Sequence, residues 1–227
     1  MGERIEYSRP DGKMTPAYYS APAKENAPGI VLIEEWWGVT ADMMAIADRY
    51  AQLGYRVLLP DHFRGRTAAT GDEANHLMQG LDFSDAATQD VRGAITYLKG
   101  AGTKVGVTGY CMGGALALLT AMHTQEADAA VIFYGYPPPE AGDPTTIEIP
   151  IQCHFAKHDE FFPAAGVEKI EARFKQGKVP YELFWYEAKH AFANPNPVGS
   201  AGLGHYDAAA ANTSWERAVR FWKNTLM

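Results

Sequence analysis

The chain contains few cysteines, no surplus of positive charge and no long apolar run. Its 227 residues include two cysteines, Cys111 and Cys153, which lie far apart and form no Cys-x-x-Cys pair. A zinc ribbon or a disulfide framework needs more cysteines at closer spacings, so we expect neither. Reduced thiols are typical of the cytoplasm, and we therefore predict a cytoplasmic protein.

Charge and hydropathy argue against two further classes of protein. The 20 basic and 27 acidic residues are interspersed and give a net charge of −7, so no basic stripe predicts a nucleic-acid partner. The longest apolar runs, such as residues 129–134, are much shorter than a membrane span. The polar first residues lack the apolar core of a signal peptide. We therefore expect no nucleic-acid partner and no membrane partner.

Short apolar segments alternate with longer helical patterns along the chain. Segments rich in Val, Ile, Leu and aromatic residues predict buried strands at 29–35, 55–60, 104–109, 129–135, 149–156 and 181–187, after an opening hairpin at 3–9 and 16–21. Helical patterns cover 40–54, 84–100, 111–123, 163–177 and 213–224. This alternation predicts an α/β fold in a single domain, residues 1–227, with a mainly parallel sheet and helices on both faces.

Capping residues predict where two of these helices begin. Ser84 is expected to start the helix at 84–100. Thr213 and Glu216 have the spacing of a capping box, which predicts that the last helix begins at 213.

Residues 106–118, GVTGYCMGGALAL, place Cys111 between a predicted strand and a predicted helix. Gly109-x-Cys111-x-Gly113 is the cysteine form of the nucleophile elbow, in which a strained residue is flanked by glycines that let strand and helix approach. The start of the following helix favours a thiolate and presents backbone N–H groups. A glycine-rich turn with a passively buried cysteine is the alternative.

Partners for Cys111 occur in the order that an elbow hydrolase requires, an acid and then a histidine after later strands. Asp159 follows the predicted strand 149–156, and His190 follows 181–187. Because carboxyl ends of parallel strands meet at one edge of a sheet, these side chains can converge. A helix cap and a surface histidine are the alternatives for each alone, but order and context together predict a Cys–His–Asp triad.

The sequence resembles the dienelactone hydrolase family. The resemblance is carried by EEWWGV, LPDHFRG, GYCMGGALA, AKHDEFFP and YEAKHAFAN, which extend from about residue 29 to residue 194. It implies an α/β-hydrolase fold and hydrolysis of a small-molecule ester or lactone through an acyl-cysteine. The implied catalytic residues are Cys111, His190 and Asp159.

The resemblance also implies a role for Glu35. At this position the family has a glutamate that keeps the resting thiol protonated and accepts its proton when substrate arrives. Strand alternation sends the neighbouring Glu34 to the opposite face. The backbone N–H groups of Trp36 and Met112 are expected to form the oxyanion hole.

One position departs from the family pattern. The family holds its substrate carboxylate with two arginines, one of them four residues after the catalytic histidine, where this chain has Asn194. The helical stretch at 71–83 supplies no arginine for the other. Asn194 and Arg64 are the polar candidates for the substrate pocket, although Arg64 and Arg66 are more typical of a solvated surface. We expect neutral esters or lactones to be accepted at least as well as acidic ones.

Aromatic residues next to the triad are further pocket candidates, with core packing as an equal alternative. They are Trp37, Tyr134, Phe161, Phe162 and Phe192.

No cofactor motif is present. His154, His158, His190 and His205 with Cys153 match no metal pattern, and Gly109, Gly113 and Gly114 do not complete a dinucleotide fingerprint, so we expect no metal and no cofactor.

Two other functions remain open at this point. A thioesterase or acyl transferase would use the same acyl-cysteine, and a non-catalytic binding module would keep the fold without the chemistry. The oligomeric state is expected to be a monomer or a small homo-oligomer.

Overall fold

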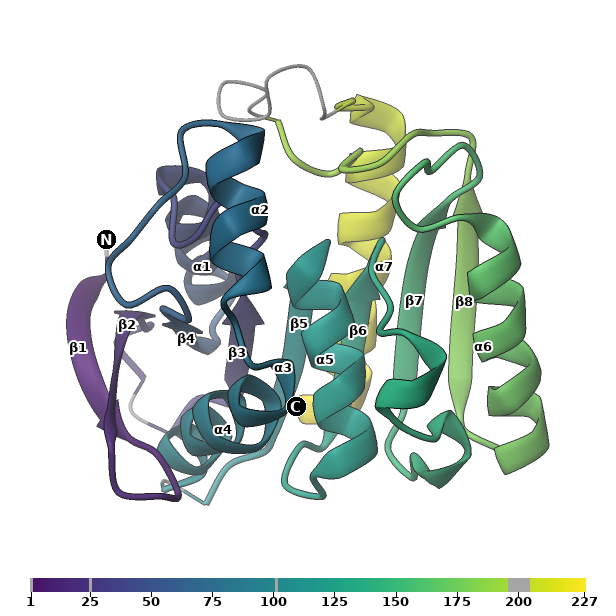
Figure 1. Ribbon diagram of the computed structural model, residues 1–227. Coiled ribbons are helices and arrows are strands. Elements are labelled where there is room, and N and C mark those ends of the chain that lie inside the picture. Colours follow the sequence, from purple (N-terminus) through teal and green to yellow (C-terminus); the bar gives the residue numbers. More distant parts are fainter. Residues whose placement is uncertain (1, 25, 101, 196–204) are drawn as a thin grey trace.

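One sheet of eight strands organises the computed structural model within the residues that it describes, 2–24, 26–100, 102–195 and 205–227 (Figure 1). The strand order is β1-β2-β4-β3-β5-β6-β7-β8. The strands are β1 (Glu3–Ser8), β2 (Met14–Ser20), β3 (Gly29–Ile33), β4 (Arg56–Pro60), β5 (Val105–Tyr110), β6 (Ala129–Phe133), β7 (Ile151–Ala156) and β8 (Tyr181–Tyr186).

The predicted pairing pattern is confirmed. β1 and β2 form an antiparallel hairpin, and β2 also runs antiparallel to β4. From β4 onward every neighbouring pair is parallel. Every residue of β3, β4, β5, β6 and β7 is buried, which explains why these strands are continuously apolar rather than alternating.

Helices cover both faces of the sheet, with α4, α5 and α6 in front and α1 and α7 behind in Figure 1. This arrangement confirms the predicted α/β-hydrolase architecture. The helices are α1 (Ala41–Gln52), α2 (Gly71–Gln79), α3 (Phe83–Asp85), the π-helical turn η1 (Ala86–Val91), α4 (Arg92–Lys99), α5 (Met112–His123), the 3₁₀ turns η2 (Pro139–Ala141) and η3 (Pro144–Thr146), α6 (Ala164–Gly177) and α7 (Ala208–Leu226).

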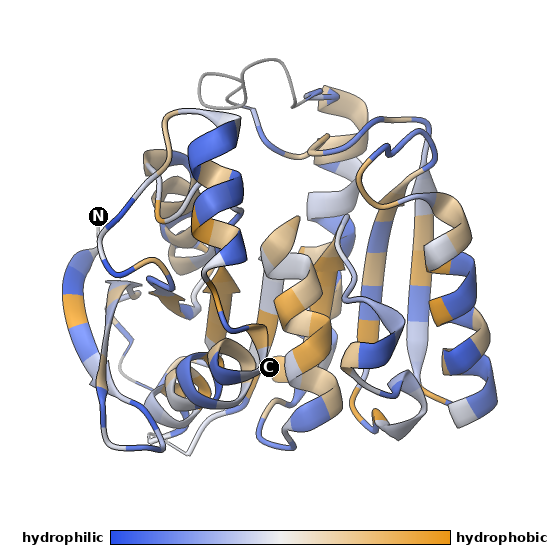
Figure 2. Cartoon of the chain, in the orientation of Figure 1, coloured by the Kyte–Doolittle hydropathy of each residue, from blue (hydrophilic) through white to orange (hydrophobic). Residues whose placement is uncertain are grey.

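The sheet and α5 form the apolar centre of the molecule. Figure 2 shows hydrophobic residues concentrated on the central strands and on α5. Residues 112–121 of α5 are all buried, as its all-round apolar pattern predicts. None of the helices in the described ranges is long and apolar enough to cross a membrane.

Two predicted helix starts are wrong. The segment predicted to begin at Ser84 is capped by Asp82, whose side chain accepts a hydrogen bond from Asp85 N–H, and it passes through η1 before α4. The last helix begins at Ala208 rather than Thr213, because Asp207 accepts the N–H of Ala210 and an alanine run follows it.

A buried histidine joins β7 to its neighbours. His154 lies between the rings of Phe133 and Phe184, with centroids 4.7 and 5.7 Å away. Its Nδ1 is 2.8 Å from the Tyr186 hydroxyl and its Nε2 is 2.9 Å from the Gln152 side-chain oxygen. Because the Gln152 oxygen can only accept, Nε2 carries the hydrogen and the ring is neutral. Burial, aided by the Arg217 charge, lowers the pKa of His154 to about 3.

This histidine predicts a loss of stability in acid. The unfolded chain binds the His154 proton near pH 6.5, whereas the folded protein binds it only near pH 3. The unfolding free energy should therefore fall by about 1.4 kcal/mol per pH unit below pH 6.5 because of this residue. Urea unfolding of wild type and His154→Gln between pH 7.5 and pH 4.5 measures this, and the variant should show the shallower dependence. Parallel curves would contradict the assignment.

Candidate active site

Cys111 occupies a strained turn between β5 and α5. Its backbone has φ 56° and ψ −117°, a conformation that costs a non-glycine residue about 1–3 kcal/mol. The turn is held by a 3.0 Å hydrogen bond from Cys111 N–H to the Phe133 carbonyl oxygen. Tyr134 and Ala191, which follow β6 and His190, also have positive φ values of 35° and 59°. Strain of this kind clusters at functional sites.

The glycines around Cys111 are required by close backbone approach. A Cβ on Gly113 would lie 2.4 Å from the Ile33 carbonyl oxygen and 2.6 Å from that of Glu34. A Cβ on Gly109 would lie 2.0 Å from the Gly113 carbonyl oxygen. The spacing around the cysteine therefore brings the start of α5 against the end of β3.

His190 and Asp159 lie where the sequence predicts, at the carboxyl ends of β8 and β7. The His190 Nδ1 is 2.8 Å from Asp159 Oδ2. The other carboxylate oxygen accepts the N–H groups of Phe161 and Phe162 at 2.8 and 2.9 Å. With Nδ1 donating to Asp159, Nε2 is left for the Cys111 sulfur, which acts on the imidazole electrostatically. The imidazole thus interacts with both of the other predicted residues.

The charges next to His190 favour a protonated imidazole. Burial lowers the pKa of His190, but the Cys111 sulfur and the Asp159 carboxylate outweigh it, and the pKa rises to about 10. An imidazolium beside the sulfur stabilises a thiolate, which is the nucleophilic form of cysteine.

Glu35 lies at the end of β3 on the Cys111 side and is buried. Its Oε1 accepts the Tyr134 hydroxyl at 3.3 Å and its Oε2 accepts the Asn194 amide at 2.7 Å. Within the described residues no hydrogen bond joins Glu35 to Cys111. Burial raises the pKa of Glu35, while His190, Asn194 and Tyr134 act in the opposite direction.

Asn194 therefore has a partner that the sequence did not indicate. Its amide donates to Glu35 from 159 positions away in the chain. Tyr134, predicted as a pocket residue, is buried and shares this carboxylate. No local pattern could have linked residues so distant in sequence.

Aromatic rings surround the imidazole. The ring centroids of Phe161, Phe162 and Tyr134 lie 4.9, 5.6 and 5.3 Å from that of His190. Phe161 is 47% exposed, and its ring is 6.3 Å from Trp36, so these two form an accessible aromatic wall. Two other predicted pocket residues are buried: Trp37 packs against Trp36, and Phe192 packs against Tyr134.

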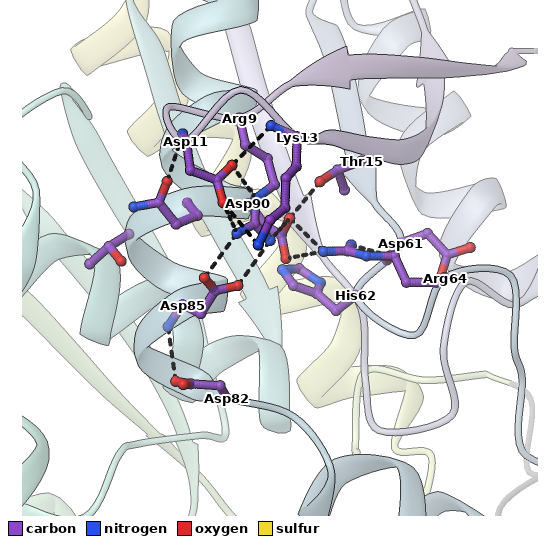
Figure 3. Close-up of polar contacts among 12 residues, drawn as sticks. Arg9, Asp11, Lys13, Thr15, Asp61, His62, Arg64, Asp82, Asp85 and Asp90 are labelled. Atoms are coloured by element: carbon purple, nitrogen blue, oxygen red, sulfur yellow. Dashed lines mark hydrogen bonds and ion pairs between the residues drawn. The ribbon is translucent and has the colours of Figure 1, made fainter.

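Arg64 lies in a different cluster. Its guanidinium donates to both oxygens of Asp90 at 2.8 Å and to the Asp61 carbonyl oxygen (Figure 3). Arg66 donates to the Phe63 carbonyl oxygen. In the part of the chain that the structure describes, no arginine or lysine forms an ion pair with Glu35 or Asp159.

The histidines considered as metal ligands have other partners. His158 is 3.1 Å from Glu187, and the backbone N–H of His205 donates to the His190 carbonyl oxygen. Across residues 2–24, 26–100, 102–195 and 205–227, no three His, Cys, Asp or Glu side chains form a group that could hold a metal ion.

Comparison with known proteins identifies relatives over the whole chain. The model of the dienelactone hydrolase family matches residues 15–226. Protein usf of Aquifex pyrophilus is 31% identical over the full length of both chains. Carboxymethylenebutenolidase of Pseudomonas putida is 31% identical, with 96% of this chain and 95% of the relative covered. A solved dienelactone hydrolase-like promiscuous phosphotriesterase from metagenomic libraries superposes with a TM-score of 0.84 at 22% identity, covering 100% of this chain and 99% of that chain.

The contact of His190 with Asp159 predicts how Cys111 reacts. Asp159→Asn keeps the size of the side chain but removes a charge that raises the pKa of His190, so the sulfur should have a cation beside it less often. Iodoacetamide alkylation of Cys111 at pH 7 should therefore slow by about tenfold, the effect of one unit in the pKa of the imidazole. Mass spectrometry after timed exposure measures the rate. Asp143→Asn, on an exposed residue of the η3 cap, is the matched control. Identical alkylation rates in wild type and Asp159→Asn would contradict the coupling.

Proposed function

The chain belongs to the dienelactone hydrolase family and is a hydrolase of the ester or lactone type, and we propose that it works through a Cys–His–Asp triad and an acyl-cysteine intermediate. The observation that carries the proposal is the hydrogen bond between His190 and Asp159 beside a cysteine on a strained elbow, whose sulfur acts on the same imidazole. Each member has the environment that its role requires.

Acylation begins with Cys111 and His190. The thiol proton passes to Glu35 as substrate enters, and the thiolate beside the His190 imidazolium attacks the carbonyl carbon of the substrate to form a tetrahedral intermediate. As the C–O bond to the leaving alcohol breaks, the imidazolium donates its Nε2 proton to that oxygen. A lactone keeps its alcohol on the same molecule, because only the ring is opened. Asp159 holds Nδ1 and stabilises the imidazolium.

Deacylation uses the same groups with water. His190 removes a proton from water as its oxygen attacks the acyl carbon, and the C–S bond then breaks. The products are the carboxylic acid and the restored Cys111–His190 pair.

Two backbone N–H groups are proposed to stabilise the negative oxygen in both steps. Met112 is the first residue of α5, so its N–H has no partner inside the helix and lies at the positive end of the helix dipole. Trp36 lies in a turn closed by a hydrogen bond from Gly38 N–H to the Glu35 carbonyl oxygen. Removing one such donor typically costs about 10²–10³ in kcat.

Glu35 is proposed to govern the thiol proton. A carboxylate near the sulfur opposes a second negative charge and so protects the resting thiol. Its hydrogen-bond donors, Tyr134 and Asn194, are neutral and so do not form an ion pair with it. The raised pKa caused by burial makes Glu35 able to accept the thiol proton when substrate enters and to return it to the sulfur when the acyl group leaves.

The substrate is proposed to be a neutral ester or lactone with an apolar or aromatic group. Trp36 and Phe161 offer an aromatic wall, and Asn194 replaces a cation with an amide already bonded to Glu35. A substrate carboxylate would meet Glu35 without an arginine in the described residues to offset it.

The remaining properties are proposed from the chemistry. The nucleophile works only as a reduced thiol, and both cysteines are free, which fits the cytoplasm. We propose that residues 1–227 act as a single catalytic domain, as a monomer or small homo-oligomer.

Cys111→Ala should abolish ester turnover and keep the fold, because alanine leaves no nucleophile. The loss should be at least about 10³-fold in kcat, as expected when a covalent nucleophile is removed. Aryl-ester hydrolysis measures it, with circular dichroism as the check on folding. Cys153→Ala, which removes a buried thiol from β7, is the matched control and should retain kcat. Residual activity of a tenth in the Cys111→Ala, Cys153→Ala double variant would overturn the acyl-cysteine mechanism.

Substrate charge provides a second test. A neutral lactone should give a kcat/KM at least equal to that of its carboxylate-bearing analogue, because no arginine or lysine in the described residues pairs with Glu35 to offset a second carboxylate. Initial rates at pH 7 on matched pairs measure the ratio. A tenfold preference for the acidic member would show that a cation does reach the substrate.

A further inference from the structure

A second buried carboxylate–histidine pair lies next to the candidate active site. Glu34 precedes Glu35 in the chain, and its side chain points to the opposite side of β3, as strand alternation predicts. Its Oε1 accepts the backbone N–H of His62 at 2.9 Å, and its Oε2 is 2.8 Å from His62 Nδ1. Both side chains are fully buried. Glu34 thus holds both the main chain and the ring of His62.

The pair has the character of a buried ion pair. A carboxylate can only accept, so Nδ1 carries a hydrogen. Burial lowers the pKa of His62, but the charge and the hydrogen bond of Glu34 outweigh it and the net effect is a rise. Such pairs are costly to bury, and apolar replacements are often as stable, so a requirement for geometry can explain why one is kept.

His62 also lies next to a polar network centred on Asp90. The His62 ring lies beside the Asp90 carboxylate, whose charge acts on it (Figure 3). Asp90 is bound by Arg64 at 2.8 Å, Thr15 at 2.5 Å and Arg9 at 3.3 Å. Arg9 is in turn paired with Asp85 and Asp11. This polar network ties the segment after β4 to the β1–β2 hairpin and to η1.

The main chain at Glu34 lies against the nucleophile elbow. The carbonyl oxygens of Ile33 and Glu34 lie against Gly113, so near that a Cβ there would be within 2.6 Å of either. The next residues, Glu35 and Trp36, are those proposed for the thiol proton and the oxyanion. A second tie, from Ala68 N–H to the Trp37 carbonyl oxygen at 3.0 Å, joins the two segments again.

We propose that Glu34 and His62 are positioning residues that fix the main chain of residues 34–36 against the elbow and so aim the Trp36 N–H at the substrate oxygen. This inference rests on the proposed function. Glu34 is held by two hydrogen bonds to His62, and only Glu35 separates it from Trp36 in the chain. The pair can therefore limit the movement of the Trp36 N–H. A displacement of about 1 Å at such a group can cost about 10²-fold in rate.

His62→Phe and His62→Asn test the proposal. Phenylalanine fills the space of the ring without the Nδ1 donor, whereas the asparagine amide can donate to Glu34 from a similar place. We expect His62→Phe to lose about tenfold to hundredfold in kcat with KM nearly unchanged. His62→Asn should recover most of that loss. Rates are expressed per folded molecule, with the folded fraction measured by circular dichroism, so that unfolded protein does not count.

Affinity for an aryl trifluoromethyl ketone separates positioning from stability. Its adduct with Cys111 carries a negative oxygen like that of the tetrahedral intermediate, so its affinity should fall in parallel with kcat in His62→Phe. His154→Phe is the matched control, since His154 is an equally buried histidine bonded through Nδ1 but lies on β7. That variant should lose stability while retaining the wild-type kcat per folded molecule.

If His62→Phe does not fold, the paired replacement Glu34→Leu with His62→Leu leaves no unpaired charge and carries the same expectation. Wild-type kcat and ketone affinity in whichever of these variants folds would overturn the positioning role. That result, with Cys111→Ala inactive, would leave the triad intact. Turnover by Cys111→Ala would instead overturn the proposed function itself.

Discussion

The close approach of α5 to the end of β3 is the constraint on which the site depends. Gly113 permits it, since a Cβ would overlap the carbonyl oxygens of Ile33 and Glu34. The approach places the first N–H groups of a buried helix beside the segment that carries Glu35. It also explains the strained φ of Cys111, because the chain must turn from β5 into α5 within one residue. The packed sheet and the buried residues 112–121 of α5 hold that strain in place.

Charge in the site is arranged around His190. Asp159 is fixed by two backbone N–H groups and by the imidazole, so its carboxylate cannot swing away from the ring. The imidazole sits between this carboxylate and the sulfur, and its raised pKa expresses the attraction of both. Buried charges are tolerated when they are paired and hydrogen-bonded, and Asp159 and His190 meet that requirement. The aromatic rings around the imidazole exclude water and strengthen these interactions.

Local patterns were enough to predict the strands and the elbow, because these features depend on residues adjacent in the chain. The order of Asp159 and His190 could be predicted because sites in such sheets lie at the carboxyl ends of strands. The errors arose where a stronger local signal was overlooked, as at Asp207, which caps α7 before the capping box at Thr213. The contacts of Asn194 with Glu35 and of His62 with Glu34 join residues far apart in sequence. Such contacts exist only once the sheet has formed, so no periodicity or spacing contains them.

The two adjacent glutamates after β3 are held in different ways, and this contrast fits the roles proposed for them. Glu34 is hydrogen-bonded to both the main chain and the ring of His62, so it is held in one place and suits a geometric role. Glu35 has neutral donors, Tyr134 and Asn194, and burial raises its pKa, which suits a group that is proposed to change its charge when the site fills. An arginine in place of Asn194 would neutralise Glu35 and weaken its repulsion of a thiolate. The amide orients the carboxylate without cancelling its charge, which fits the proposed control of the Cys111 proton by Glu35.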